Sequence, residues 1–323
     1  MPTPQALHLD LSVPMGDGRP HDPELTVLSD GAGQDSFAIL LKLTRNPAFR
    51  ARWAPHRLLG IHADTGNEHE ETYAHLRRAR EVYAAADVPF IHVTADLGFH
   101  TPLWRTLGHF FRAKSAIMAV AYPKSCTDNL KVRPFYKVLE AFIADHPAHQ
   151  RYGFARSGKR GLYQYAERFG KIRVLLGIAR GEERRVAKAS SGPKWMAECI
   201  ERVYPLIELG WNRADVQAYI ESQLEVVPPP SNCIMCPFKS LPELLWTFRH
   251  YPAQFAEWER YEATKIEAWR ERTAAAGKKN HGVFGIRTLH ERVTLAEAQF
   301  GWMSDAELTA HRMTHGHCVT AAY

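Results

Sequence analysis

Short apolar runs alternate along the chain with segments whose apolar residues recur every three to four positions. The short runs are typical of buried strands, which we expect at residues 25–29, 57–62, 89–94 and 172–178. The longer period predicts helices at residues 37–43, 70–86, 102–117 and 134–143. Strands that alternate with helices in this way indicate an α/β fold with a mostly parallel sheet flanked by helices.

The pattern changes near residue 226. Three consecutive prolines within residues 226–231 predict a stiff linker, and helical periodicity returns at residues 241–249 and 252–272. Residues 273–282 are polar and predict a loop. We therefore divide the chain into a tail (1–24), an α/β domain (25–225) and a helical C-terminal region (226–323).

Composition excludes several classes of protein. No uncharged apolar run approaches the ~20 residues of a membrane span. The first residues carry no positive n-region, so we expect a cytoplasmic protein without membrane association. Five cysteines are an odd number that cannot all pair in disulfides, and in a reducing compartment closely spaced cysteines bind metal or do redox chemistry.

The net charge of +6 is concentrated in residues 151–185, which hold ten basic against three acidic residues. Aromatic residues are interleaved with these charges: Tyr152, Phe154, Tyr163, Tyr165 and Phe169. Such a segment suits phosphate contact and base stacking on a nucleic acid. A solvated crossover before a strand explains it equally well.

Two turns that follow predicted strands are candidate ligand sites. The first, residues 29–36, contains small residues that let backbone amides approach an anion at a helix N-terminus. A tight turn with a capped helix is the alternative. The second places Asp64 at the carboxyl end of a strand, where ligands bind in open α/β sheets, although an Asp/Thr helix cap is common. His62 and His92 lie within strand patterns and are expected to be core histidines.

The cysteines form a third candidate site. Cys233 and Cys236 make a Cys-x-x-Cys pair, which suits zinc, an iron–sulfur cluster or a redox disulfide. Cys126 lies among basic residues that favour its thiolate. The missing ligands would be Cys126, Cys318, Cys199 or a histidine, although Cys199 occupies an ordinary core position of a predicted helix spanning residues 196–203.

Five ordered segments resemble the phosphoadenosine phosphosulfate (PAPS) reductase-like branch of the adenine nucleotide α-hydrolase (PP-loop) superfamily. They are residues 31–36, 63–73, 126–134, 177–185 and 204–219, and the resemblance spans about residues 25–240. Members with a trailing Cys-x-x-Cys-Pro also match Gly316 and Cys318. The chain departs from the usual loop in having Gly31, Ala32 and Gln34 where the family has Ser-Gly-Gly and often Lys.

The resemblance implies a Rossmann-like fold, binding of ATP or a related adenine nucleotide with Mg²⁺, and a [4Fe-4S] cluster with zinc as its rival. Catalytic residues would be Asp35, Ser36, Asp64 and Arg180. Nucleotide-binding residues would be Ser29, Gly31, Ala32, Gly33, Gln34, Asp35, Ser36, Asp64, Thr65, Gly66 and Lys131. Metal ligands would be Cys126, Cys233, Cys236 and Cys318.

The implied activity is adenylation of a target followed by sulfur delivery, as in DNA phosphorothioation enzymes and tRNA thiolases. Its partners would be DNA or tRNA and a sulfur-donor protein such as a cysteine desulfurase, with the oligomeric state open. Two alternatives remain. One is a PAPS or APS reductase-like oxidoreductase, and the other is a catalytically weak nucleic-acid-binding module, which the altered loop suggests.

Overall fold

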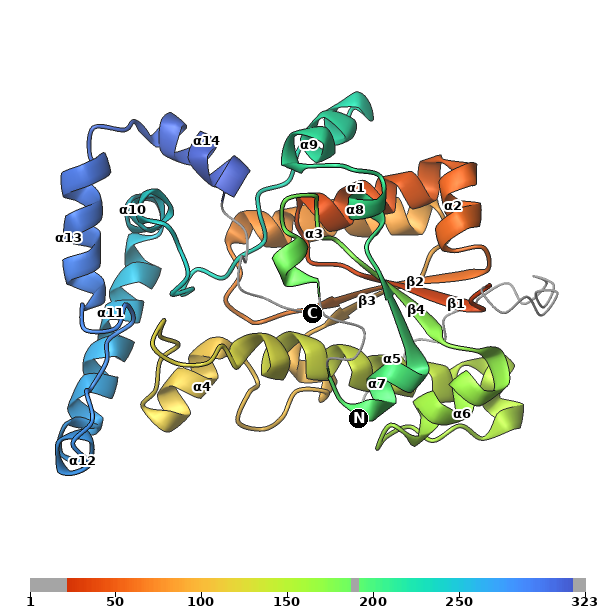
Figure 1. Ribbon diagram of the computed structural model, residues 1–323, viewed down its shortest axis with the longest axis horizontal. Coiled ribbons are helices and arrows are strands. Elements are labelled where there is room, and N and C mark those ends of the chain that lie inside the picture. Colours follow the sequence, from red (N-terminus) through yellow and green to blue (C-terminus); the bar gives the residue numbers. More distant parts are fainter. Residues whose placement is uncertain (1–21, 187–191, 316–323) are drawn as a thin grey trace.

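A five-stranded, all-parallel β-sheet forms the centre of the protein in a computed structural model that describes residues 22–186 and 192–315 (Figure 1). The strand order is β3-β2-β1-β4-β5. The strands are β1 (Leu25–Ser29), β2 (Arg57–Ala63), β3 (Phe90–Val93), β4 (Ile172–Leu176) and β5 (Ile200–Val203). This arrangement confirms the α/β class and the four predicted strands.

Helices cover both faces of the sheet because apolar side chains alternate between the faces along each strand (Figure 1). Val27, Ile61 and Val174 pack in one core cluster, whereas Leu28 and Leu175 pack in the other. The first cluster lies under α5 (Arg133–Asp145), α6 (Arg160–Phe169) and α7 (Lys194–Cys199). The second lies under α1 (Gln34–Arg45), α2 (Pro47–Trp53), α3 (Glu70–Ala85), α8 (Pro205–Glu208) and α9 (Arg213–Ser222).

A third core cluster lies at one end of the molecule. It joins Phe111 and Leu130, which precede the predicted linker, to Ile234, Met235 and Trp258, which follow it. The two regions on either side of the proline-rich segment therefore share a core, and Trp258 is a packing residue as expected. The helices here are α4 (Leu107–Lys114), α10 (Leu241–His250), α11 (Pro252–Ala268), α12 (Arg270–Ala275), α13 (Leu289–Phe300) and α14 (Asp305–His315).

Short helical turns complete the fold: η1 (Ala95–Leu97), η2 (Thr127–Val132), η3 (Pro147–Tyr152) and η4 (Glu183–Arg185). η2 has π-helical geometry and runs directly into α5. None of the described helices has both the length and the apolar composition that crossing a membrane would require.

Several predicted elements were wrong in extent or type. The helix expected at residues 102–117 is only α4, because the Thr106 side chain caps its start and left-handed Ser115 ends it. Residues 200–203 were expected to continue a helix but form β5, because they pair with β4. The helix expected at 252–272 is divided at Trp269 into α11 and α12, and α12 takes up the start of the loop expected at 273–282.

The topology creates a crevice at the carboxyl ends of β1 and β4. From β1 the chain moves outward through β2 to β3, and it then crosses to the opposite side of β1 to form β4. Loops that leave β1 and β4 therefore diverge, and ligands of open α/β sheets bind at such a switch point.

Candidate functional site

The turn between β1 and α1 is held in shape by Asp30, a residue that the sequence did not single out. Its buried carboxylate accepts hydrogen bonds from the Ala32 amide (2.8 Å), Ser36 Oγ (2.9 Å) and the Tyr83 hydroxyl (3.0 Å). Ala32 adopts a left-handed φ of 54° within this turn, and Gly33 begins α1 without any side-chain cap. The first amides of α1 therefore remain open to an anion.

A polar pocket of about 620 Å³ surrounds this turn. Three cationic side chains line it: Lys131, Arg185 and Arg213. The wall opposite the turn is Ser231, whose amide would lie 3.1 Å from a Cβ at Gly33. The end of the predicted linker, Pro230 and Ser231, is thus part of the pocket wall and does more than connect two regions.

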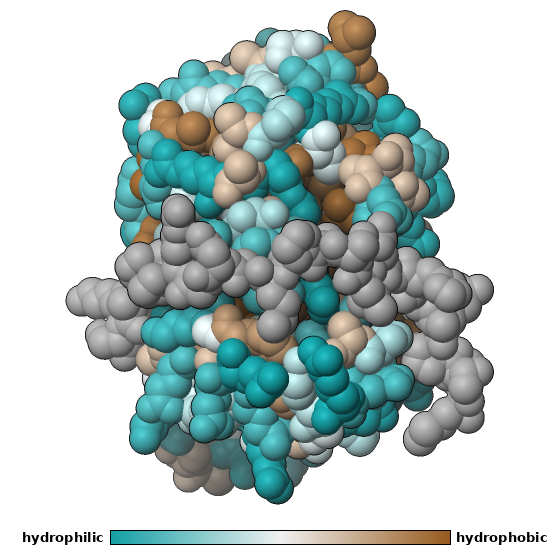
Figure 2. Space-filling view, turned by 90° about the vertical axis from the view of Figure 1, so that its right-hand side faces the viewer, coloured by the Kyte–Doolittle hydropathy of each residue, from teal (hydrophilic) through white to brown (hydrophobic). Residues whose placement is uncertain are grey.

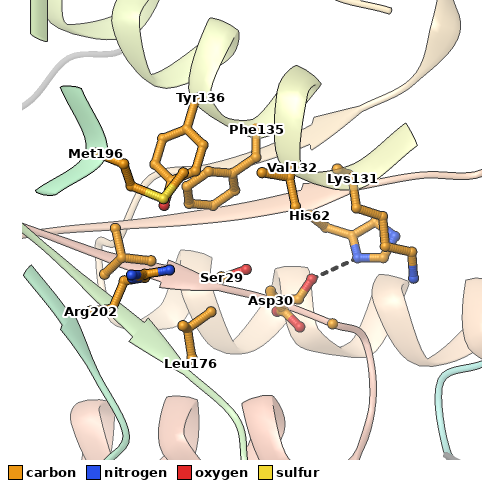
Figure 3. Close-up of a pocket in the computed structure, with 13 residues that line it drawn as sticks. Ser29, Asp30, His62, Lys131, Val132, Phe135, Tyr136, Leu176, Met196 and Arg202 are labelled. Atoms are coloured by element: carbon orange, nitrogen blue, oxygen red, sulfur yellow. Dashed lines mark hydrogen bonds between the residues drawn. The ribbon is translucent and has the colours of Figure 1, made fainter. Parts of the chain in front are cut away.

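A second compartment of about 570 Å³ adjoins the first, and the two share Ser29, Gly31, Lys131 and Leu176 as lining residues (Figure 3). Its other walls are largely apolar: Val132, Phe135, Tyr136, Val174 and Met196, with Arg202 at the edge. A cationic compartment beside an aromatic one matches the two ends of a nucleotide, since phosphates need charge and a base needs an apolar slot.

Six of the seven predicted loop residues line the polar compartment: Ser29, Gly31, Gly33, Gln34, Asp35 and Ser36. Ala32, which was also predicted to bind the nucleotide, is fully buried and lines neither compartment. Asp35 Oδ1, however, accepts a 2.7 Å bond from Arg213, so its carboxylate is engaged by a cation. The Gln34 amide donates to the Met313 carbonyl (3.1 Å), which ties α14 to the loop.

Arg180 was a predicted catalytic residue, but the structure places it elsewhere. Its side chain is exposed, and Arg180 is not among the residues that line either compartment. The arginines that do line the polar compartment are Arg185 and Arg213, and both pair with Glu182. Both lie in the segments that carry the resemblance, which was the available signal for them.

Asp64, Thr65 and Gly66 form the second predicted turn. Asp64 accepts bonds from the Gly66 amide (2.8 Å) and the Tyr73 hydroxyl (3.0 Å), and its other oxygen lies 3.4 Å from His92. Burial alone would raise the pKa of Asp64, but the hydrogen bonds from His92, Gly66 and Tyr73 outweigh it and lower the pKa to about 2.

This second turn was expected to bind the nucleotide, yet none of its three residues lines either compartment. Asp64 and Gly66 instead line a separate cleft of about 800 Å³. The cleft is rimmed by polar and charged side chains: Asp96, Arg105, Thr106, His109 and Arg112. Strand ends that are neighbours in the sheet therefore open onto two different cavities.

Two of the predicted metal ligands lie against one core cluster. Cys126 and Cys233 pack against the same core cluster, although they lie more than a hundred positions apart in the chain. Cys233 Sγ lies 3.4 Å from Thr65 Oγ1 and 3.8 Å from Glu68 Oε1, and Lys131 Nζ lies 3.2 Å from that same Glu68 oxygen. Lys131 therefore connects the two-compartment pocket with Glu68, which contacts Cys233.

Burial determines the protonation state of the Cys233 thiol. Burial raises the pKa of the Cys233 thiol well above its usual range, and Glu68 adds to the rise against the opposing charge of Lys131. The thiol is thus protonated at neutral pH, and a metal that binds there must displace the proton. None of the four described cysteines forms a disulfide.

The remaining cysteines differ in position. Cys199 lies in the core cluster under α5, α6 and α7, a different cluster from that of Cys126 and Cys233, and its burial raises its pKa to about 11. It is a core residue, as its sequence pattern indicated, and not a fourth ligand. Cys318 and the matching Gly316 lie outside the described residues.

The aromatic residues of the basic segment 151–185 do not form the expected stacking surface. Phe154 and Tyr165 are buried in the sheet's core cluster, and Tyr152 stacks on Phe154, so only Tyr163 of the five is exposed. Arg156 is exposed, pairing with Asp145 at 2.5 Å. The end of the molecule that carries α2 and α6 has a largely hydrophilic described surface with smaller apolar areas (Figure 2).

No family model matches the chain, and no curated protein matches it.

Proposed function

We propose that this protein binds an adenine nucleotide and acts as a nucleotide-dependent sulfur-transfer enzyme that adenylates a nucleic acid and then delivers sulfur to it. The observation that carries the proposal is the juxtaposition of the two-compartment pocket with the thiols. Lys131 lines both compartments and pairs with Glu68, which in turn contacts Cys233. A nucleotide-activated target and a sulfur-handling centre would lie within reach of one another.

The nucleotide phosphates would lie on the first amides of α1, where the helix dipole and the glycines favour an anion. Lys131, Arg185 and Arg213 would neutralise their charge. The base would occupy the apolar compartment between Phe135 and Leu176. Asp35 lines the phosphate compartment and supplies the type of oxygen ligand that Mg²⁺ prefers. Its Oδ1 also accepts the hydrogen bond from Arg213.

An iron–sulfur cluster and a single zinc ion require different separations between the thiols. Tetrahedral zinc with ~2.3 Å bonds holds its sulfurs about 3.8 Å apart. Among the described residues, Cys126, Cys233 and Cys236 do not form a group with sulfurs within 4.8 Å of one another. A cubane spaces its thiolates more widely because each binds a different iron. We propose Cys126, Cys233 and Cys236 as ligands, with Cys318 as the fourth, and the bound cluster would supply electrons or labile sulfide.

Cys126→Ala and Cys233→Ala are each expected to remove most of the iron and acid-labile sulfide from anaerobically purified protein, because each variant deletes a ligand. Cys199→Ala is the matched control and should retain both, since Cys199 packs in a different core cluster. Iron and sulfide analysis with zinc measured in parallel provides the readout. Iron that persists in both ligand variants, or zinc without iron in the wild type, contradicts the cluster.

The proposed reaction requires a sulfur acceptor and a sulfur donor. We propose DNA or tRNA as the acceptor and a protein such as a cysteine desulfurase as the donor, in the reducing cytoplasm. The charge of segment 151–185 supports a polyanionic acceptor. Only one of its five aromatics, Tyr163, is exposed, which favours contact through phosphates over contact through stacked bases.

Pyrophosphate release from ATP, measured with and without DNA or tRNA, tests the activity. We expect release that depends on the nucleic acid, and nucleic-acid affinity that falls with salt at a log–log slope of about −0.9 per phosphate contact on duplex DNA. Replacing Arg156, Lys159 and Arg160 with Ala should flatten this slope. Absence of nucleic-acid binding at low salt favours the small-molecule reductase, and binding without pyrophosphate release favours the catalytically weak module.

A further inference from the structure

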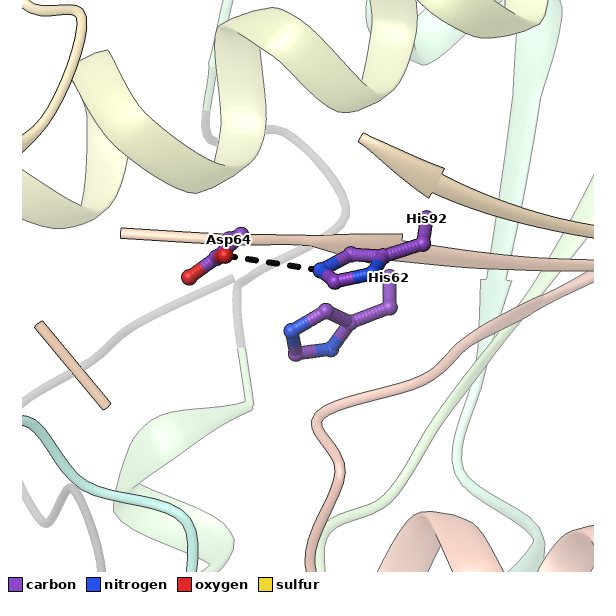
Figure 4. A group of neighbouring side chains, drawn as sticks. All are labelled: His62, Asp64 and His92. Atoms are coloured by element: carbon purple, nitrogen blue, oxygen red, sulfur yellow. Dashed lines mark ion pairs between the residues drawn. The ribbon is translucent and has the colours of Figure 1, made fainter. Parts of the chain in front are cut away.

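Two histidines and an aspartate converge at the carboxyl ends of β2 and β3 (Figure 4). His62 and Asp64 are two positions apart in an extended segment, so their side chains project from the same face. His92 is the register partner of His62 on the neighbouring parallel strand, and the Asp64 amide continues the ladder by donating to the Val93 carbonyl (3.1 Å). Strand geometry alone therefore brings the three side chains together.

The three groups have the spacing of a metal site. One potential ligand atom from each residue lies within 4.8 Å of those of the other two. His92 Nε2 and Asp64 Oδ2 are 3.4 Å apart, which is the separation of two ligands at about 2.1 Å from a tetrahedral ion. In Figure 4 both imidazoles project from their strands in the direction of Asp64.

His62 is already oriented as a ligand. Its Nδ1 lies 2.8 Å from the Asp30 main-chain oxygen, so that nitrogen carries the proton and Nε2 keeps its lone pair. His62 is 1 % exposed, and its Nε2 has no hydrogen-bond partner among the residues that the structure describes. A buried polar nitrogen without a partner is costly in a folded protein, and a bound ion would satisfy it. Ligating histidines commonly donate their second nitrogen to a carbonyl in this way.

We propose that His62, Asp64 and His92 bind one divalent transition-metal ion, for which zinc is the best fit. Two imidazoles and one carboxylate suit zinc and its neighbours, whereas Mg²⁺ and Ca²⁺ prefer oxygen ligands. Three protein ligands leave a coordination position open, as in catalytic zinc sites. His62 lines the apolar compartment and Asp64 lines the separate cleft, so the ion would lie at the boundary of the two cavities.

The test uses full-length protein with Cys233→Ser and Cys236→Ser, so that the thiol pair does not contribute zinc. After chelator treatment, this protein is expected to take up one equivalent of zinc by elemental analysis and calorimetry. Adding His92→Ala should weaken zinc binding at least 100-fold. His56→Ala is the matched control, because the His56 side chain is as exposed as that of His92 (15 %) and lies 3.6 Å from Asp22, but His56 belongs to no group of three potential ligands in the described residues.

Asp64→Asn provides a second variant that preserves side-chain shape, and we expect it to weaken zinc binding at least 10-fold. Circular dichroism verifies that each variant is folded. Cobalt should give visible absorption bands without thiolate charge transfer, and His92→Ala should remove them. Equal zinc affinity in the folded His92→Ala protein, or no zinc uptake in the protein with both cysteines replaced, would overturn the proposal. Neither measurement involves nucleotide or sulfur transfer, so the result is independent of the proposed function.

Discussion

Gly33→Asp is expected to abolish ATP binding while leaving the protein folded. Gly33 is the N-cap residue of α1 and supplies no side-chain cap, and the amides that follow it are those a phosphate would need. Aspartate is a favoured N-cap, so its carboxylate would bond these amides itself. Its charge about 4 Å from a phosphate would also cost about 4 kcal/mol at an effective dielectric constant of 20, roughly a thousandfold in Kd.

Gly33→Ala is the matched control for this variant. Its methyl group makes the same close approach to Ser231, at 3.1 Å from the amide nitrogen, but carries no charge. We therefore expect Gly33→Ala to retain measurable ATP binding by calorimetry. Wild-type affinity in Gly33→Asp would contradict the phosphate assignment, and complete loss in Gly33→Ala would assign the effect to the contact with Ser231 instead of charge.

Asp30→Ala is expected to destabilise the fold by about 3 kcal/mol or more, measured by urea denaturation. The substitution leaves the Ala32 amide, the Ser36 hydroxyl and the Tyr83 hydroxyl without their acceptor in a buried setting. Each unsatisfied buried donor costs about 1–3 kcal/mol, although the costs do not add fully. The expected loss of stability has two sources. Three donors are left unsatisfied, and the carboxylate that holds the turn in shape is removed.

Two further variants separate these contributions. Tyr83→Phe removes a single hydrogen bond to Asp30 Oδ2 and should cost about 1 kcal/mol. Asp30→Asn retains an acceptor for the Ala32 amide, so its cost should fall between the other two. An Asp30→Ala protein as stable as the wild type would show that the carboxylate does not hold the turn.

The sequence predicted the elements whose signal is local. Apolar runs located four strands, and the small residues after the first of them located the turn where α1 begins. β5 was missed because four residues carry little periodicity, and Ile200–Val203 becomes a strand through its pairing with β4. The same limit applies to η2, whose π-helical geometry has no distinct pattern in its residues.

The candidate site was also predicted only in part from the sequence. The sequence identified the phosphate-binding turn, the Cys-x-x-Cys pair and Asp64, because each is a short motif with its own chemistry. It could not place Arg213 or Ser231 against that turn, since both come from segments about two hundred positions further along the chain.

Long-range packing also separated residues that the sequence grouped. Asp64 was grouped with the nucleotide-binding turn, yet the sheet directs it to another cavity, beside His62 and His92. His62 and Asp64 share a face by strand alternation, which was readable from the sequence, but His92 joins them only through the register of β2 with β3. The local spacing of apolar residues and short motifs thus determined most elements and the candidate chemistry, whereas strand pairing and core packing between distant segments decided which side chains meet.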